Sequence, residues 1–436
     1  MSSAVLERIR ASDFAPESGR VRSVAPGVIE ATGPCRKLGE LCSIELVSEE
    51  ALLGEIIAVD EQRVLLSPLE TTRTVPLGAR VVALGGGGMV AVGDPFAGRA
   101  INSLGEPIDG GGRPEQAHWW PIEGRVPTPL SRTEPDQPAS TGIRAIDAFL
   151  TLGRGQRVGL IAASGVGKTS LVEQLAAQVE ADKVILCLVG ERGREVQNFW
   201  RRIEAREDRQ RFTIVAATSD ESAARRARAP TVALALAEYW RAQGQHVLLL
   251  VDSITRLAMA LREIGLAAGS PPTVRAYTPN VFSVLPRLVE RCGALADGGA
   301  ITAIMTVLSE TDDVDDPIVE LMKSLLDGHI VLSRSLAEQG QFPAIDVTRS
   351  VSRGVQARIT STHSRAVRDI VAMLAAYNEG RVMIEAGAYR SGTNPMLDRA
   401  IARKDAIQRF LTQSMDEDVP FDQSIGAVSN LAGLTS

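Results

Sequence analysis

A glycine-rich stretch followed by a lysine and a threonine carries the clearest chemical pattern in the sequence. It occupies 162–170 and lies between an apolar run at 157–163 and a helical pattern that begins near Lys168. Glycines let backbone N–H groups approach a phosphate closely, and the start of a helix adds a partial positive charge. The pattern predicts that Lys168 reaches the β- and γ-phosphate oxygens of a nucleoside triphosphate and that the Thr169 hydroxyl binds Mg²⁺.

The turn itself is expected to hold the phosphates through its backbone. The expected nucleotide-binding residues are Ser164, Gly165, Val166, Gly167, Lys168, Thr169 and Ser170. Ala162 stands where the first glycine of such a turn is usual, so the sequence departs from the common pattern at one position. The strand before the turn and the helix after it favour a phosphate site over a chance loop.

A second candidate is the aspartate that ends the apolar run 246–252. A buried strand of this kind presents a carboxylate at its carboxyl end, and P-loop enzymes use such an aspartate to hold Mg²⁺. Many buried strands end in aspartate, so this pattern alone is weak. Its distance from the glycine-rich turn leaves room for two strand–helix units, which favours Asp252 as a metal ligand.

The third candidate follows the apolar run 183–189, where Glu191 and Arg192 begin a crowd of charged residues. Ligands bind at the carboxyl ends of strands in open α/β sheets, which places these side chains beside the phosphate turn. Glu191 is expected to act as the general base that polarises water, and Arg192 to contact the γ-phosphate. The alternative is a solvated charged turn.

Arg353 follows a short polar stretch at 350–352. A guanidinium that reaches a transferring phosphoryl group stabilises its charge, and only its reach is required. From the residues alone, a surface arginine is the simpler interpretation.

These side chains need a scaffold, and the chain from about residue 142 supplies an α/β pattern. The expected strands lie at 157–163, 183–189, 211–217, 246–252, 300–308 and 329–332. Helical periods fall between them, as at 168–179 and 231–243. Continuous apolar strands between helices predict a mostly parallel sheet that is buried on both faces.

The remaining sequence predicts further parts around this core. We expect an N-terminal segment at 1–20, a small β-barrel or sandwich at 21–90, a linker at 91–130, the α/β domain at 131–362 and a helical domain at 363–436. Trp119 and Trp120 are expected to anchor the linker by burying both rings, with ligand stacking as the alternative. The acidic segment 309–316 is interpreted as solvated, because it lacks the spacing of a calcium loop.

Composition argues against several classes of protein. The formal charge of -6 argues against a nucleic-acid binder, which usually carries a basic surface. The cysteines, Cys35, Cys42, Cys187 and Cys292, form no close pair, which disfavours a zinc site and suits a reducing compartment. No apolar run approaches the roughly 20 residues that span a bilayer, and no signal peptide is visible, so we expect a cytoplasmic protein.

Several long blocks identify a family. The stretches 190–196 (GERGREV), 252–256 with 262–269, 324–334 (SLLDGHIVLSR) and 342–347 resemble the ATPases of type III secretion and flagellar protein export. That family is similar to the catalytic subunits of rotary ATP synthases. The resemblance extends from about residue 20 to the end of the chain. It implies a β-barrel, a RecA-like P-loop core and a helical C-terminal domain, assembled as a homohexamer with ATP at the subunit interfaces.

The resemblance also implies roles for individual residues. It makes Glu191 the catalytic base, Arg192 a γ-phosphate contact and Arg353 the finger that reaches the ATP of a neighbouring subunit. Phe342 stands where the family has an aromatic residue near the adenine, with packing in the core as the alternative. The loop 269–279 would face the central pore, and residues 1–20 occupy a region that relatives use for oligomerisation and for docking a regulator.

The function implied by this resemblance is Mg-ATP hydrolysis that powers protein export, with release of chaperones and unfolding of substrates. The wording of 324–334 favours an injectisome over a flagellum. Implied partners are a coiled-coil central stalk, a stator or regulator subunit, chaperone–substrate complexes and the export gate, with the ATPase peripheral at the inner membrane and no nucleic acid bound. The alternatives are a rotary ATP synthase subunit and a hexameric RNA translocase.

Overall fold

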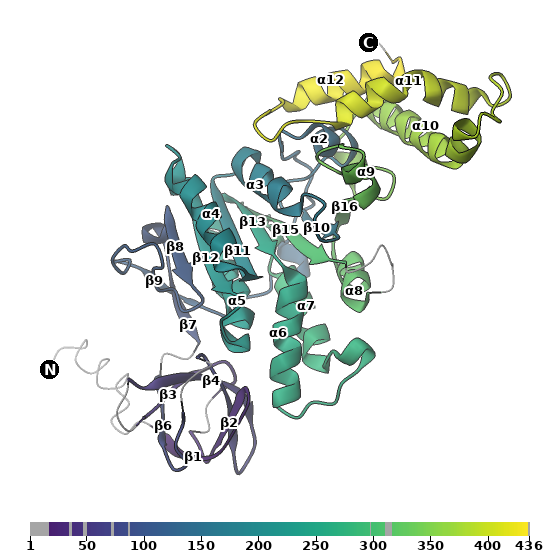
Figure 1. Cartoon of the computed structure of the whole chain (residues 1–436). Helices are drawn as coiled ribbons and strands as arrows, with labels where there is room; N and C mark the ends of the chain where they lie inside the picture. The colour runs from purple at the N-terminus through teal and green to yellow at the C-terminus, as the bar shows by residue number, and fades with distance from the viewer. Residues whose placement is uncertain are drawn as a thin grey trace.

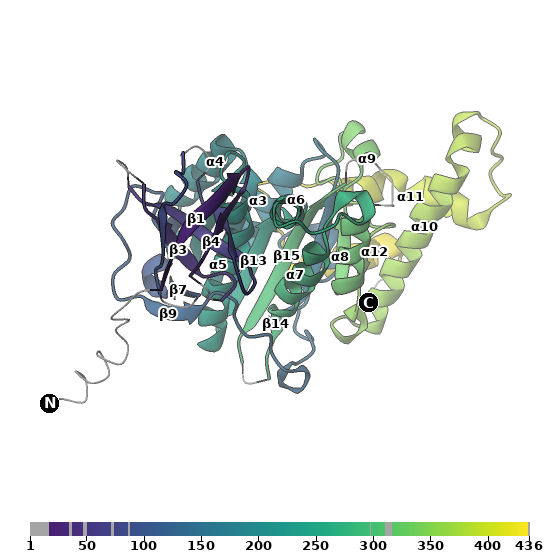
Figure 2. The same ribbon diagram turned by 90° about the horizontal axis from the view of Figure 1, so that it is seen from below.

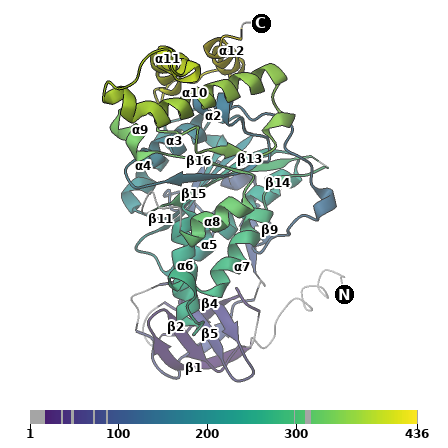
Figure 3. The same ribbon diagram turned by 90° about the vertical axis from the view of Figure 1, so that its right-hand side faces the viewer.

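The computed structural model describes residues 17–34, 37–46, 50–70, 74–85, 88–296, 298–309 and 316–434. Most of the N-terminal segment 1–20, most of the acidic segment 309–316 and Cys35 lie outside the described residues. The described chain forms three parts, with a β-barrel at one end, an α/β core in the middle and a helical cap at the other end (Figures 1 and 3). The predicted fold class is confirmed.

The barrel is closed and antiparallel. Its strands are β1 (Ser18–Ala25), β2 (Val28–Ala31), β3 (Leu41–Ile44), β4 (Leu52–Val59), β5 (Val64–Pro68) and β6 (Arg80–Ala83). They pair in the order β1-β2-β5-β4-β3-β6. Alternate residues point inward, so Ile29 of β2, Ile44 of β3 and Leu66 of β5 fill the interior. The structure therefore has a barrel, and not the sandwich that the sequence left as the alternative.

The core is a largely parallel sheet in the order β17-β16-β10-β15-β13-β11-β12-β8. Its strands are β8 (Arg99–Asn102), β10 (Arg157–Ala162), β11 (Lys183–Glu191), β12 (Phe212–Thr218), β13 (His246–Asp252), β15 (Ala300–Leu308), β16 (Gly328–Val331) and β17 (Val351–Ser352), with the short β14 (Gly293–Ala294) paired to β15. β17 runs antiparallel to β16, and β8 pairs in parallel with β12.

Helices cover both faces of this sheet (Figure 1). They are α2 (Arg144–Phe149), α3 (Lys168–Gln178), α4 (Gly193–Glu204), α5 (Ala223–Ala242), α6 (Ile254–Ala267), α7 (Pro279–Glu290), α8 (Pro317–Leu325) and α9 (Arg334–Glu338). Alternate residues of β11 serve opposite faces. Leu186 and Leu188 belong to the hydrophobic cluster that includes α2–α4, while Ile185 and Val189 belong to the cluster that includes α5–α8. This explains why the strands are continuously apolar.

The segment 91–130, predicted as a linker, contributes structure of its own. It supplies β8 at the edge of the sheet, and its β9 (His118–Pro121) pairs with β7 (Met89–Val92). The prediction that both tryptophan rings are buried is wrong for Trp119, which is 70% exposed. Neighbouring residues of a strand point to opposite faces, so only Trp120 turns inward, where its Nε1 donates to Glu238 at 3.1 Å.

The cap consists of α10 (Ser361–Glu385), α11 (Pro395–Leu411) and α12 (Phe421–Ala432). Figure 2 shows α10 and α11 at the end of the molecule away from the barrel. Pro395 occupies the first turn of α11, and the Asn394 side chain caps it by accepting from the N–H of Met396. None of the helices in the described part of the chain combines the length and the apolar character needed to span a lipid bilayer.

Candidate active site

Four parallel strands bring the candidate residues to one edge of the sheet. β10, β15, β13 and β11 are successive neighbours that run in the same direction. Their carboxyl ends therefore meet, and there β10 leads into the glycine-rich turn, β11 ends at Glu191 and β13 ends at Asp252. Open α/β sheets bind ligands at this edge.

The turn has the backbone conformation that its glycines allow. Gly165 and Gly167 have φ angles of 82° and 91°, in the left-handed region that residues with a Cβ rarely adopt. Gly167 caps α3, which begins at Lys168. Ala162 is an extended, buried residue of β10, so the departure from the usual glycine places no Cβ in a left-handed position. The N–H groups at the start of α3 therefore have a geometry that suits a phosphate.

Lys168, Glu191 and Asp252 form one charged cluster. The Lys168 ammonium is paired with the Asp252 carboxylate and lies 3.5 Å from Oε1 of Glu191. The side chains of Lys168 and Glu191 are 11% exposed, and that of Asp252 is 2% exposed. Charges this well buried interact strongly because little water screens them.

The Asp252 carboxylate has a second partner that the sequence analysis did not identify. Thr306 Oγ1 donates to Asp252 Oδ1 at 2.6 Å, and both residues are buried. Thr306 lies on β15, which pairs with β13, so it faces the end of the neighbouring strand. A signal was present in the sequence, since Thr306 is a polar residue inside the apolar run 300–308.

The backbone next to Glu191 is irregular, and this orients its side chain. The pairing of β11 with β12 shifts register between Val189 and Glu191, and Gly190 has a φ of 68°. A Cβ at Gly190 would lie 3.1 Å from Cβ of Arg256, so α6 packs directly against this bend. Neither Gly190 nor Arg256 was singled out from the sequence.

Burial raises the pKa of Glu191, and the neighbouring carboxylates of Asp252 and Glu195 raise it further, while the Lys168 ammonium opposes the shift. A carboxylate with a raised pKa is a stronger base than an ordinary glutamate at neutral pH. The arrangement can therefore hold phosphate with Lys168 and accept a proton at Glu191.

Phe342 lies beside the glycine-rich turn although it is far away in sequence. A Cβ at Gly167 would lie 3.5 Å from Cδ1 and Cε1 of the Phe342 ring, and the residue is 46% exposed. A half-exposed ring next to the turn is available for stacking, which disfavours the alternative of core packing. The backbone also ties this loop to the cap, because Gln413 N donates to Phe342 O at 2.8 Å.

Two predicted residues do not join the cluster. Arg192 is exposed at the N-cap of α4, directly after Glu191. Arg353 follows β17, and its N–H donates to the carbonyl of Asp327 at the amino end of β16, with Nη2 on the carbonyl of Lys323 at 3.3 Å. The amino ends of the strands lie roughly 15–20 Å from the glycine-rich turn at their carboxyl ends, so Arg353 does not reach the Lys168 of its own chain.

Two family models match the chain. Residues 142–352 match the nucleotide-binding domain of the ATP synthase alpha/beta family, and residues 359–430 match the T3SS EscN ATPase C-terminal domain. The first match contains the glycine-rich turn, Glu191 and Asp252, and the second covers most of the helical cap.

Curated relatives match over nearly the whole chain. The flagellum-specific ATP synthase of Bacillus subtilis (strain 168) is 40% identical over 432 residues, which cover 99% of this chain and 98% of that protein. The type 3 secretion system ATPase of Sinorhizobium fredii is 42% identical over 414 residues, which cover 95% and 92%.

Solved structures show the same architecture. The assembled ATPase EscN of the enteropathogenic E. coli type III secretion system superposes with a TM-score of 0.90 at 38% identity, covering 95% of this chain and all of that one. EscN in complex with its central stalk EscO gives a TM-score of 0.86 at 37% identity.

Proposed function

This chain belongs to the family of type III secretion and flagellar export ATPases, relatives of the ATP synthase alpha/beta subunits, and we propose that it hydrolyses Mg-ATP to power export through a type III secretion system of the injectisome kind. The observation that carries the mechanism is the contact of Lys168 with both Asp252 and Glu191 at the end of the phosphate-binding turn.

The roles in hydrolysis follow from the positions of the side chains. The turn and the start of α3 bind the phosphates of ATP, and Lys168 exchanges its carboxylate partners for phosphate oxygens. Glu191 then orients the attacking water and accepts its proton. We propose that Phe342, which lies beside Gly167, contacts the adenine, and that Arg192, exposed and next to Glu191 in the chain, contacts the γ-phosphate.

The site also has oxygen donors that suit Mg²⁺. Thr169 in the first turn of α3 supplies a hydroxyl, and Asp252 supplies a carboxylate that Thr306 holds in place. When bound, Mg²⁺ would neutralise charge on the phosphates.

We further propose that the subunits assemble into a homohexamer in which Arg353 acts on the ATP of a neighbour. Its position at the opposite edge of the sheet supports this role, because it cannot serve its own site. The assembled state and the stalk complex of EscN support a ring of this kind around a coiled-coil stalk.

Within the cell, we propose that the ring lies in the cytoplasm, peripheral at the inner membrane, together with a stator or regulator. There it would release chaperones from substrates and unfold them for the export gate. Flagellar export is the second candidate, favoured by the 40% identity to the Bacillus subtilis relative. Deleting the gene and measuring motility against effector secretion decides between the two.

Two substitutions test the hydrolytic site. We expect Lys168→Ala to abolish ATP binding and Glu191→Gln to retain binding while phosphate release falls by at least about a hundredfold. Glu204→Gln is the matched control, since Glu204 is an exposed carboxylate at the end of α4. Undiminished phosphate release from both Lys168→Ala and Glu191→Gln would exclude this site.

A further inference from the structure

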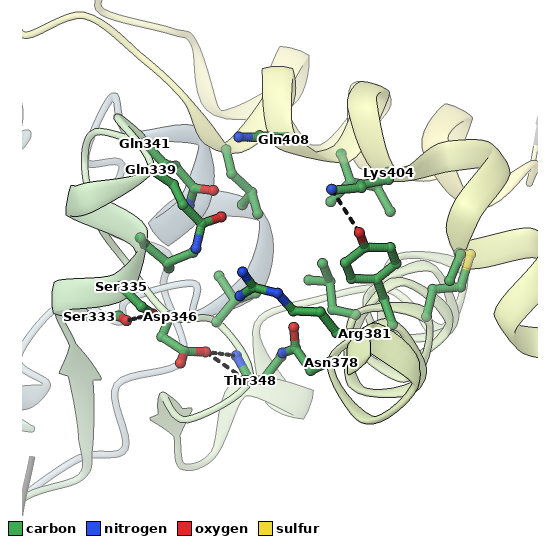
Figure 4. Close-up of a pocket in the computed structure, with 18 of the residues that line it drawn as sticks. Ser333, Ser335, Gln339, Gln341, Asp346, Thr348, Asn378, Arg381, Lys404 and Gln408 are labelled. Carbon is green, nitrogen blue, oxygen red and sulfur yellow. Dashed lines mark hydrogen bonds between the residues drawn. The ribbon is translucent and has the colours of Figure 1, made fainter. Parts of the chain in front are cut away.

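A cavity lies between the core and the cap, outside the catalytic cluster. It has a volume of about 190 Å³. The core contributes residues from α9 and from the segment 339–348 that follows it, and the cap contributes residues from α10 and α11 (Figure 4). Cavities of about 150 Å³ hold a single benzene ring, so this one has room for a ring-sized organic molecule.

The walls of the cavity are partly apolar. They include Ile345, Val347, Met373, Ile407 and Leu411, all of which are buried. The transfer of an apolar group from water into this space is favourable, because the group removes its apolar surface from water.

One polar group in the cavity lacks a partner. Gln341 is 5% exposed, and its Nε2 has no hydrogen-bond partner among the described residues. A buried donor without an acceptor costs free energy, so the site favours a ligand that carries an acceptor. Figure 4 shows Gln341 on the core side of the cavity, with Arg381 reaching from α10 toward that side.

Arg381 supplies a positive charge for such an acceptor. Its Nε donates to Glu385 at 2.7 Å, and within the described residues no hydrogen bond is found from its two terminal nitrogens. Lys404 adds a second cation, which donates to the hydroxyl of Tyr377 at 2.8 Å. A guanidinium is well suited to bind a carboxylate with two parallel hydrogen bonds.

The charged groups around the cavity balance one another, which favours a ligand of low charge. Two cations, Arg381 and Lys404, face two carboxylates, Asp346 and Glu385. Asp346 accepts from N and Oγ1 of Thr348, and these two donors satisfy part of its hydrogen-bonding capacity. Because these charges sum to zero, a second negative charge on the ligand gains no net attraction.

We propose that this cavity is a binding site for a small organic carboxylate with a ring-sized apolar body, held by Arg381 and Gln341 between the core and the cap. The site is separate from the proposed hydrolytic function. It is connected to the nucleotide site by the chain itself, because Gln341 directly precedes Phe342, and Phe342 O accepts from Gln413 of the cap. A ligand that joins the two walls therefore acts on the loop that carries Phe342.

The binding test uses the full chain without nucleotide and benzoate as the probe, measured by ligand-observed NMR and calorimetry. We expect saturable binding that weakens at least about tenfold in Arg381→Gln and in Gln341→Leu. Arg390→Gln is the matched control, an exposed arginine of the same cap outside the cavity, and should bind benzoate like the wild type. Arg381 is exposed, so its variant reports on binding even where the buried Gln341→Leu fails to fold.

Three results overturn the site. They are absence of saturable benzoate binding, an equal loss of benzoate affinity in Arg390→Gln and Arg381→Gln, and binding of neutral benzamide or inorganic phosphate as tight as that of benzoate.

A second measurement tests the link to Phe342. Saturating benzoate should change the affinity for ADP about fivefold or more in the wild type and leave Arg381→Gln unchanged. An unchanged ADP affinity in the wild type overturns the link.

Discussion

Thr306 provides the sharpest test of how the site holds its aspartate. Thr306→Val removes a hydroxyl and keeps the volume and shape of the side chain. The Asp252 carboxylate, 2% exposed, then loses a donor at 2.6 Å that water cannot easily replace. Hydrogen bonds to charged groups contribute about 1.5–3 kcal/mol, so the free energy of unfolding should fall by roughly this amount.

Thr306→Val should also weaken the binding of Mg²⁺ that supports ATP hydrolysis. Groups that hold a metal ligand in place typically change metal affinity or activity by about 10- to 100-fold, so the Mg²⁺ concentration for half-maximal ATPase activity should rise within this range. Urea unfolding and Mg²⁺ titrations of phosphate release measure the two effects. Thr306→Ser, which keeps the hydroxyl, should recover most of both. If Thr306→Val matches the wild type in stability and in its Mg²⁺ requirement, Thr306 does not position Asp252.

Two further predictions concern the subunit interface and a buried carboxyl group. Arg353→Ala should keep ATP binding and lose hydrolysis on the order of 10³-fold. Mixing Arg353→Ala subunits with Lys168→Ala subunits should restore part of the activity, because some interfaces then hold both intact residues. No recovery on mixing would contradict action on a neighbour. Burial raises the pKa of Asp147 from 3.8 to about 6, so the folded state binds this proton more tightly than the unfolded chain. Asp147 therefore contributes to the free energy of unfolding below about pH 4, and this contribution, roughly 3 kcal/mol, is lost as the pH rises through about 6. Asp147→Asn should flatten this pH dependence, measured by urea unfolding.

The core of the fold was predictable because its strands are buried on both faces. β10, β11 and β13 are continuous apolar runs between helices, which is the pattern typical of parallel strands covered on both faces. β8 was missed since four residues at a sheet edge carry little periodicity.

Some residues of the candidate site could likewise be predicted from the sequence, and others could not. Glu191 and Asp252 could be found from the sequence because each ends an apolar strand, and Lys168 because it follows a glycine-rich turn between a strand and a helix. Thr306, Gly190 and Arg256 act through neighbours that only the pairing of strands and helices brings together. The burial of Trp119 was wrongly predicted because the sequence does not show which face of β9 turns inward.

The cluster also links nucleotide binding to the strength of the base. Lys168 lies near two carboxylates, and its positive charge holds down the pKa of Glu191 against the effects of burial and of Asp252. When Lys168 moves to the phosphates, Glu191 loses part of this stabilisation and faces the negative charge of the substrate. Both changes raise the pKa of Glu191, and Mg²⁺ held at Asp252 would lower it, so we infer that Lys168 and Mg²⁺ together control this pKa. In the chain without nucleotide, Lys168 lies beside both carboxylates and holds the pKa of Glu191 down.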